Sequence, residues 1–295
     1  MNAVAKGCEV SWFSALCDDD YEFLGQPDAA LKSSWEHCRN IVLTAEKGGF
    51  DNILLPSGYA LGIDTTAFAA AIATVTRRIK LLMAVRVGDA WPPQLARQIA
   101  TLDQLANGRL NVNIISSEMP GEVLASAPRY QRTVEVMEIL KTLLNGEPLD
   151  YQGDHYRIRI DPPGIKTVSG KCPPLYFGGL SPDARDAAAR AADVYLMWPD
   201  TMPAVREVVA DMTKRASALA APPGAAPPIL PRLCMGDWRQ WHRSSPLDPG
   251  GERANPPGET QLPPGDSPHF AGRRLKLPLI CQRQLLCFRE GAKPR

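Results

Sequence analysis

The sequence predicts an α/β protein of the TIM (β/α)₈ barrel type, incomplete, with about six βα units. Short apolar runs rich in Val, Ile and Leu alternate with longer stretches of helical period, which is typical of helices packed on a parallel sheet. The alternation stops near residues 219–223, where proline-rich sequence begins. Because a barrel of this type needs eight strands to close, we expect the barrel to be incomplete.

The first four units fill the N-terminal half of the chain, and several carry clear boundary signals. Gly48 and Gly49 end the first helix, and Pro92 stands in the first turn of the third, where a missing N–H costs least. Asn107 and Gly108 close that third helix. The strands and their helices are expected at 9–13 and 31–48, 52–55 and 64–75, 80–85 and 92–106, and 110–115 and 128–145.

An insertion at residues 149–173 comes before the last two units. Within it, residues 151–160 alternate in polarity, which predicts an exposed β-hairpin laid over the end of the barrel. The fifth strand is expected at 174–177, and the sixth unit at 193–197 with a helix at 202–219. Residues 1–220 are therefore expected to form one barrel domain.

The remaining residues, 221–295, differ in composition from everything before them. They hold 14 of the 28 prolines and show no sustained helical or strand period, so we expect an irregular tail with little ordered structure. Since this tail stands where the last strands would normally come, the hypothesis follows that it is an out-of-frame reading of the gene's end. Without those strands, the barrel would keep two unpaired strand edges, which favours aggregation.

Composition excludes several classes of function. A net charge of +1 argues against a nucleic-acid or membrane-surface partner. The first seven residues lack the apolar core of a signal peptide, and no stretch approaches the ~20 apolar residues of a membrane span, so we expect a cytoplasmic protein. The seven cysteines form no CxxC pair and no zinc pattern, so reduced thiols and no metal are expected.

One turn has the composition of a phosphate site. Gly178, Gly179, Leu180 and Ser181 stand between an expected strand and a helix, where glycines let backbone N–H groups approach a phosphate at the positive end of the helix dipole. The alternative is an ordinary turn in which Ser181 caps the helix and no ligand binds.

Three motifs together resemble the bacterial-luciferase-like flavin monooxygenases, most closely the alkanesulfonate monooxygenase branch. They are AVR at 84–86, ARQIATLDQLANGR at 96–109 and PPLYFGGLS at 173–181, with RY at 129–130 and YLMW at 195–198 in support. The match covers residues 9 to 219. The resemblance implies a barrel that uses reduced FMN and O₂ to cleave an organosulfonate to an aldehyde and sulfite. It also implies an NAD(P)H-dependent flavin reductase as the partner, and a homo-oligomer.

The same resemblance suggests roles for single residues. Asn113, on the fourth strand, is similar to a flavin-contacting asparagine, and Tyr130 to a tyrosine near the flavin phosphate; Ser116 and Ser117 would line the flavin edge. Each could equally be a packing or solvated residue. Substrate-binding candidates are Arg86, whose guanidinium suits a sulfonate, Trp91 and Trp198, with a rim salt bridge as the alternative for Arg86.

The sequence also departs from that family pattern. Residues 56–62 lack the cysteine expected after the second strand, and no position matches the arginine-x-histidine pair of the seventh strand or the later arginine and tyrosine. The substrate is therefore open, and no catalytic residue is assigned. Two rival hypotheses are a deazaflavin-dependent hydride-transfer enzyme of the same superfamily, and a non-catalytic flavin-binding remnant.

Overall fold

A computed structural model describes residues 8–14, 16, 33–59, 62–117, 119–197, 200–219, 232–234 and 286–288. All of them lie in one compact unit formed by Met1–Gly236 and Arg283–Arg295. Most of the predicted tail lies outside the described residues, so the domain boundary at 220 and the out-of-frame hypothesis stay predictions.

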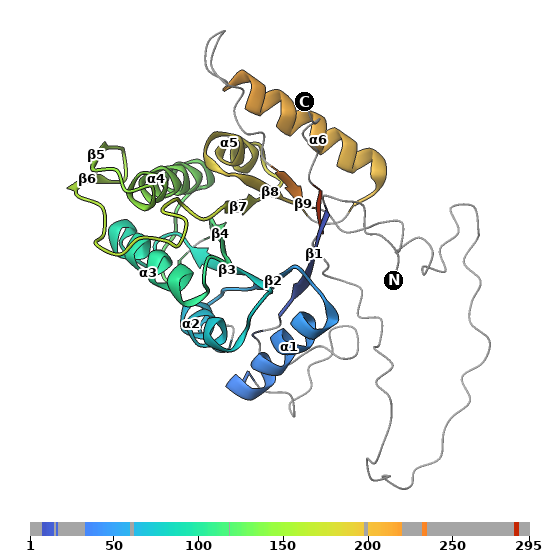
Figure 1. Cartoon of the computed structure of the whole chain (residues 1–295). Helices are drawn as coiled ribbons and strands as arrows, with labels where there is room; N and C mark the ends of the chain where they lie inside the picture. Colours follow the sequence, from blue (N-terminus) through green and yellow to red (C-terminus); the bar gives the residue numbers. More distant parts are fainter. Residues whose placement is uncertain are drawn as a thin grey trace, which may run out of the picture. The chain divides into compact units, whose positions relative to one another are not determined.

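The centre of this unit is a ring of eight strands, closed in the order β1-β10-β9-β8-β7-β4-β3-β2 (Figure 1). Six of the strands are parallel and come from the six predicted βα units, which are confirmed. The strands are β1 (Cys8–Phe13), β2 (Asn52–Leu55), β3 (Lys80–Arg86), β4 (Leu110–Ile115), β7 (Leu175–Gly178), β8 (Val194–Leu196), β9 (Arg232–Cys234) and β10 (Leu286–Phe288).

The ring is closed by two short strands from the C-terminal part of the chain. β9 pairs in parallel with β8, while β10 pairs antiparallel with both β9 and β1. The expectation that the edges of β1 and β8 stay unpaired is therefore wrong. The expectation rested on the lack of a sustained strand period after residue 220, and strands of only three residues, such as these two, are too short to show one.

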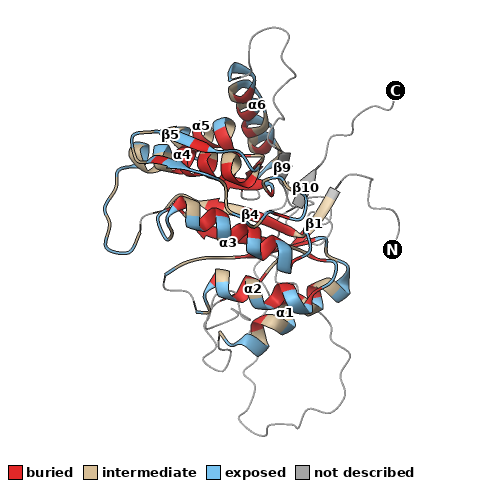
Figure 2. Cartoon of the chain, turned by 60° about the vertical axis from the view of Figure 1, so that its left-hand side comes forward, coloured by how far each residue is buried: buried red, intermediate tan, exposed pale blue. Residues whose placement is uncertain are grey.

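A helix follows each of the six parallel strands and packs on the outside of the ring with its apolar side inward (Figure 2). The helices are α1 (Trp35–Gly48), α2 (Thr65–Val75), α3 (Pro92–Leu105), α4 (Ser126–Leu144), α5 (Pro182–Ala191) and α6 (Met202–Ala218). α1 begins later than the predicted residue 31, because the Ser34 side chain accepts a hydrogen bond from the N–H of His37 and caps the helix. None of the helices in the described part of the chain is long and apolar enough to span a membrane.

The strands divide their side chains between two apolar clusters. One set of strand side chains faces the helices and belongs to the large outer core; it includes Ile53, Met83 and Phe177. Their neighbours along the strands, among them Leu54 and Tyr176, belong to a separate small cluster, to which Leu82, Val194, Leu196 and the half-buried Phe13 also belong. Since successive strand residues point to opposite faces, this second cluster lies inside the ring.

The predicted hairpin forms as β5 (Leu149–Gln152) paired with β6 (Arg157–Ile160). It packs on α4, and its expected place over the end of the barrel stays a prediction. The buried carboxylate of Glu135, on α4, accepts hydrogen bonds from the backbone N–H groups of Asp154, His155 and Tyr156 at 2.8–3.2 Å. One side chain thus satisfies the three donors of the hairpin turn, and so ties the turn to α4.

The motif at 96–109, the most specific of the sequence, has a structural role. The guanidinium of Arg109 donates hydrogen bonds to the carbonyls of Ala73, Thr76 and Ile79 and to the Thr76 hydroxyl, at 2.7–3.1 Å. It therefore satisfies carbonyls at the C-terminal end of α2. The buried carboxylate of Asp103 accepts from the N–H of Val168 at 2.8 Å and holds the inserted segment against α3.

Candidate functional site

The glycine turn lies where a parallel strand ends and a helix begins. A Cβ on Gly178 would stand 2.7 Å from the carbonyl oxygen of Leu196, and one on Gly179 would stand 2.5 Å from the Cβ of Ala184. Neither position has room for a side chain, because the backbone runs directly against β8 and α5. Leu180 is 57% exposed, so the same turn is open to solvent on its other side. These are the properties of a turn whose backbone a ligand could approach closely, and we call the Gly178–Ser181 turn the glycine cradle.

The helix after the turn, α5, begins at the turn, so the positive end of its dipole lies there, as expected. Ser181 caps α5, with its hydroxyl accepting from the N–H of Ala184 at 3.2 Å, and Pro182 occupies the first turn. The dipole of α5 places partial positive charge at this end. Asp183 adds a carboxylate in the first turn, and the Ser126 hydroxyl at the start of α4 donates to it at 3.0 Å. That carboxylate would oppose an anion over the axis of α5, so an anion could approach this end of the helix only on the turn itself.

Tyr130 lies beside this turn. Its ring packs edge-to-face on Phe177 of β7, with centroids 6.1 Å apart, and its hydroxyl lies 3.6 Å from where a Cβ of Gly179 would be. The guanidinium of Arg129 stands 5.5 Å from the centre of the Tyr130 ring. The structure thus brings together two segments that sequence reasoning chose independently, Tyr130 and the Gly178–Ser181 turn.

Asn113 and Arg86 lie on neighbouring strands and face the inside of the ring. Asn113 of β4 is paired with Ala84 of β3 and with Tyr176 of β7, and Arg86 ends β3 two residues beyond Ala84. Both are half-buried. Their position toward the carboxyl ends of parallel strands is the rim at which barrels of this type carry their ligand sites.

Arg86 lines a cavity of about 820 Å³ that extends from the strand ends toward α2 and α3. Polar side chains reach it from the loops and helices around it: Ser57, Asp64, Asp89, Gln94, Arg97, Gln98 and Thr101. Loss of solvent raises the pKa of the Asp89 carboxyl, and Asp64 raises it further, while the positive charge of Arg86 opposes the rise. Asp89 was missed from the sequence, since nothing local distinguishes it from any loop aspartate.

The remaining candidates are placed differently. Trp91 is 55% exposed and packs edge-to-face on Tyr156 of the hairpin turn, with ring centroids 5.6 Å apart, and it is not among the residues that line the cavity. Ser116 donates to the carbonyl of Arg129 at 3.4 Å, which ties the end of β4 to α4. Trp198 lies outside the described residues. No group of His, Cys, Asp or Glu suited to a metal ion occurs in the described part of the chain.

The structure is a closed α/β barrel with a glycine turn at a strand end, a tyrosine hydroxyl beside the turn and an arginine-lined cavity, and barrels of this class carry ligand sites at their strand ends. Comparison with known proteins narrows this class. The model of the luciferase-like monooxygenase family matches residues 21–240, so the chain belongs to that family. The matched region extends about twenty residues beyond the change in composition near residue 220.

Two curated relatives share much of this sequence. A sulfoquinovose monooxygenase of Novosphingobium aromaticivorans is 68% identical over 219 residues, which cover 72% of this chain and 60% of that protein. A protein of the same name from Agrobacterium fabrum is 48% identical over 229 residues, covering 76% and 57%. The chain thus spans about 60% of the length of these relatives.

Solved structures confirm the fold. A riboflavin lyase crystallised with modified FMN and riboflavin superposes with a TM-score of 0.65 at 20% identity, covering 72% of this chain and 59% of that one. At 20% sequence identity, this similarity shows the barrel fold and nothing about function.

Proposed function

We propose that this chain is a monooxygenase that uses reduced FMN and O₂ to cleave the carbon–sulfur bond of a sulfonated sugar, sulfoquinovose, to an aldehyde and sulfite. The observation that carries the proposal is the meeting of the glycine cradle, Ser181 and the Tyr130 hydroxyl at the N-terminus of α5. The family match and the 68% identity to a sulfoquinovose monooxygenase support the reaction type.

The residues at the cradle fit a flavin mononucleotide. The backbone N–H groups of the Gly178–Ser181 turn and the Tyr130 hydroxyl would hold the phosphate, because all are donors at a site with helix-dipole support. Asn113, on the inner face of β4, would hydrogen-bond the flavin ring. The flavin supplies the activation of O₂; the chain's tasks are to fix the ring and to limit the access of water.

The cavity lined by Arg86 fits a sulfonated sugar better than a plain alkanesulfonate. The guanidinium of Arg86 can bind sulfonate oxygens by paired hydrogen bonds. Asp89, Gln94 and Gln98 line the same cavity and can pair with sugar hydroxyls, whereas an alkyl chain would leave them without partners. This argues for a polyhydroxylated substrate over the alkanesulfonate that the sequence motifs alone suggested.

We propose that reduced FMN comes from a separate NAD(P)H-dependent flavin reductase, which is the arrangement that the family match supports. We also propose a homo-oligomer, and the division of the chain at about residue 220 into barrel and tail.

The test is a sulfite assay on the full chain with a flavin reductase, NAD(P)H, FMN and O₂. Sulfoquinovose is compared with a short alkanesulfonate. Because a site built to bind hydroxyls rejects substrates that lack them, kcat/KM is expected to favour the sugar by roughly a hundredfold or more. Omitting FMN must abolish sulfite release.

Other outcomes identify the rival functions. Flavin binding without sulfite from either substrate would indicate a flavin-binding remnant. Hydride transfer with a reduced deazaflavin, and none of the activity above, would indicate the deazaflavin-dependent alternative.

A further inference from the structure

The carbonyl of Gly179, in the middle of the glycine turn, accepts a hydrogen bond from a buried side chain of the outer core. The hydroxyl of Tyr195, on β8, donates a hydrogen bond to this carbonyl at 2.5 Å. Tyr195 is fully buried in the outer core, and it pairs with Phe177 across the β7–β8 ladder. The bond therefore reaches the turn from the side of the helices, whereas the side chain of the next residue, Leu180, is exposed to solvent.

Because the peptide bond is planar, this contact also fixes the direction of the next backbone N–H group in the turn. The C=O of Gly179 and the N–H of Leu180 belong to one trans peptide unit and point in opposite directions. Once Tyr195 fixes the carbonyl toward the core, the Leu180 N–H must point away from the core, toward the open side of the turn. Glycine at position 179 alone would allow this peptide to turn over, because glycine has little preference among backbone conformations.

The hydroxyl of Tyr195 is itself held by a chain of charges. Burial raises the pKa of Tyr195, and the nearby guanidinium of Arg185, on α5, lowers it. The same guanidinium pairs with Asp211 of α6 at 2.9 Å, and Asp211 also accepts from Nε of Arg215 at 3.0 Å. Contacts thus run from α6 through α5 and β8 to the Gly179 carbonyl. Sequence reasoning assigned no role to any of these four side chains.

We propose that Tyr195 is a positioning residue for the flavin phosphate: it orients the Leu180 N–H toward the ligand, and the Arg185–Asp211 ion pair fixes its hydroxyl. This rests on the proposed use of FMN. It adds a residue that touches no ligand and acts only through the backbone of the turn.

The test compares reduced FMN with reduced riboflavin, which lacks the phosphate, by anaerobic fluorescence titration of the full chain. Tyr195→Phe keeps the buried ring and removes only the donor. It is expected to weaken FMN binding about tenfold, about 1.4 kcal/mol, and to leave riboflavin binding unchanged. Asp211→Asn, farther along the chain of contacts, is expected to act in the same direction with a loss of about two- to threefold.

Tyr151→Phe is the matched control. It also removes a tyrosine hydroxyl that makes a hydrogen bond, here to Glu138 at 2.7 Å, but on the hairpin rather than at the turn. It must leave the ratio of the FMN and riboflavin affinities unchanged.

Two results would overturn the proposal in distinguishable ways. If the wild-type chain prefers FMN but Tyr195→Phe and Asp211→Asn keep the wild-type ratio, or weaken both flavins equally, the positioning role is wrong and the FMN site stands. If the wild-type chain does not distinguish FMN from riboflavin, the proposed phosphate site fails, and the role of Tyr195 fails with it.

Discussion

Removal of the Arg109 guanidinium is expected to destabilise the barrel strongly although the residue lies outside the proposed site. Arg109 makes four hydrogen bonds, three of them to main-chain carbonyls of Ala73, Thr76 and Ile79. At about 1 kcal/mol for each net hydrogen bond, Arg109→Ala should cost about 4 kcal/mol of unfolding free energy. For a domain of roughly 200 residues, that loss lowers the Tm by about 8–16 °C.

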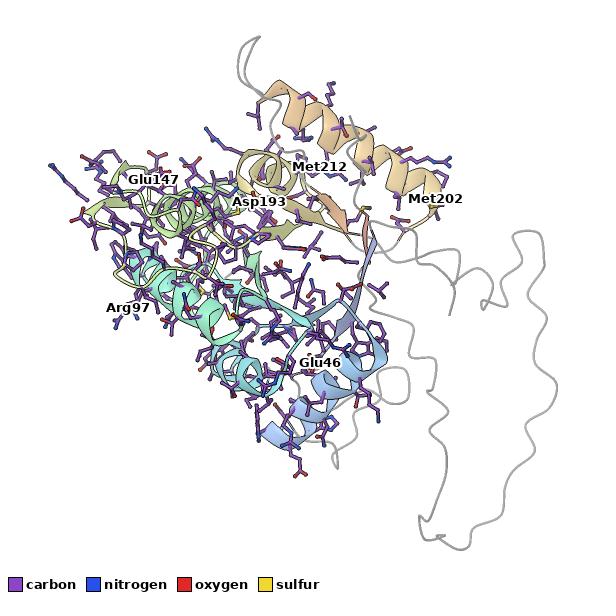
Figure 3. All side chains as sticks on the ribbon, viewed as in Figure 1. Glu46, Arg97, Glu147, Asp193, Met202 and Met212 are labelled. Atoms are coloured by element: carbon purple, nitrogen blue, oxygen red, sulfur yellow. The ribbon has the colours of Figure 1, made fainter. Side chains whose placement is uncertain are left out.

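The assay is urea unfolding followed by circular dichroism, with a thermal melt in parallel. Arg97→Ala is the matched control for stability, because Arg97 is an exposed arginine of the neighbouring α3 (Figure 3). Its removal should change the unfolding free energy by no more than about 0.5 kcal/mol. A loss below about 1 kcal/mol for Arg109→Ala, or equal losses for both variants, would refute the role of Arg109 in satisfying the carbonyls at the end of α2.

Three further predictions concern the proposed site and the barrel around it. Gly179→Ala should weaken reduced-FMN binding at least about tenfold, because the new Cβ would stand 2.5 Å from the Cβ of Ala184. Titration of the double variant with Ala184→Gly should show partial recovery, whereas full affinity in the single variant would contradict the proposed binding of FMN at this turn. Arg86→Lys should raise the KM for the sulfonate about tenfold with FMN affinity unchanged, and a change in FMN affinity alone would place Arg86 elsewhere. Loss of solvent would raise the pKa of Glu46, but hydrogen bonds from the N–H groups of residues 77–79 and the charge of Arg109 lower it. The stability from Glu46 is therefore present above its ordinary pKa and is lost as pH falls through its lowered pKa. Glu46→Gln should cost about 1 kcal/mol at about pH 7 in urea unfolding, and progressively less at acidic pH.

Local patterns were sufficient for the six strand-and-helix units and for the hairpin. Apolar runs, glycine stops and helix caps act over a few residues, so they can be read from the chain itself. The glycine turn was predicted for the same reason, since a strand end, two glycines and the capping Ser181 are neighbours in sequence. Motif resemblance then added Tyr130, and the structure places its hydroxyl beside Gly179.

Contacts between distant segments could not be predicted in this way. β10 closes the ring by pairing with β1, and the two strands stand at opposite ends of the chain. The bond from Tyr195 to Gly179 depends on the register of β7 and β8. The Asp89 carboxyl differs from an ordinary loop carboxyl because the fold buries it and places Arg86 and Asp64 near it. Trp91 follows a strand end and was therefore a candidate for the pocket, but in the fold it packs on Tyr156 of the inserted hairpin.

The central claim, that this barrel assembles a working site for reduced FMN and a sulfonated sugar, is tested most directly by a single turnover. The protein is loaded anaerobically with reduced FMN and mixed with oxygenated buffer containing sulfoquinovose, and sulfite is measured against the flavin bound. The account predicts sulfite in proportion to the bound flavin. Reoxidation of the flavin without sulfite would contradict it.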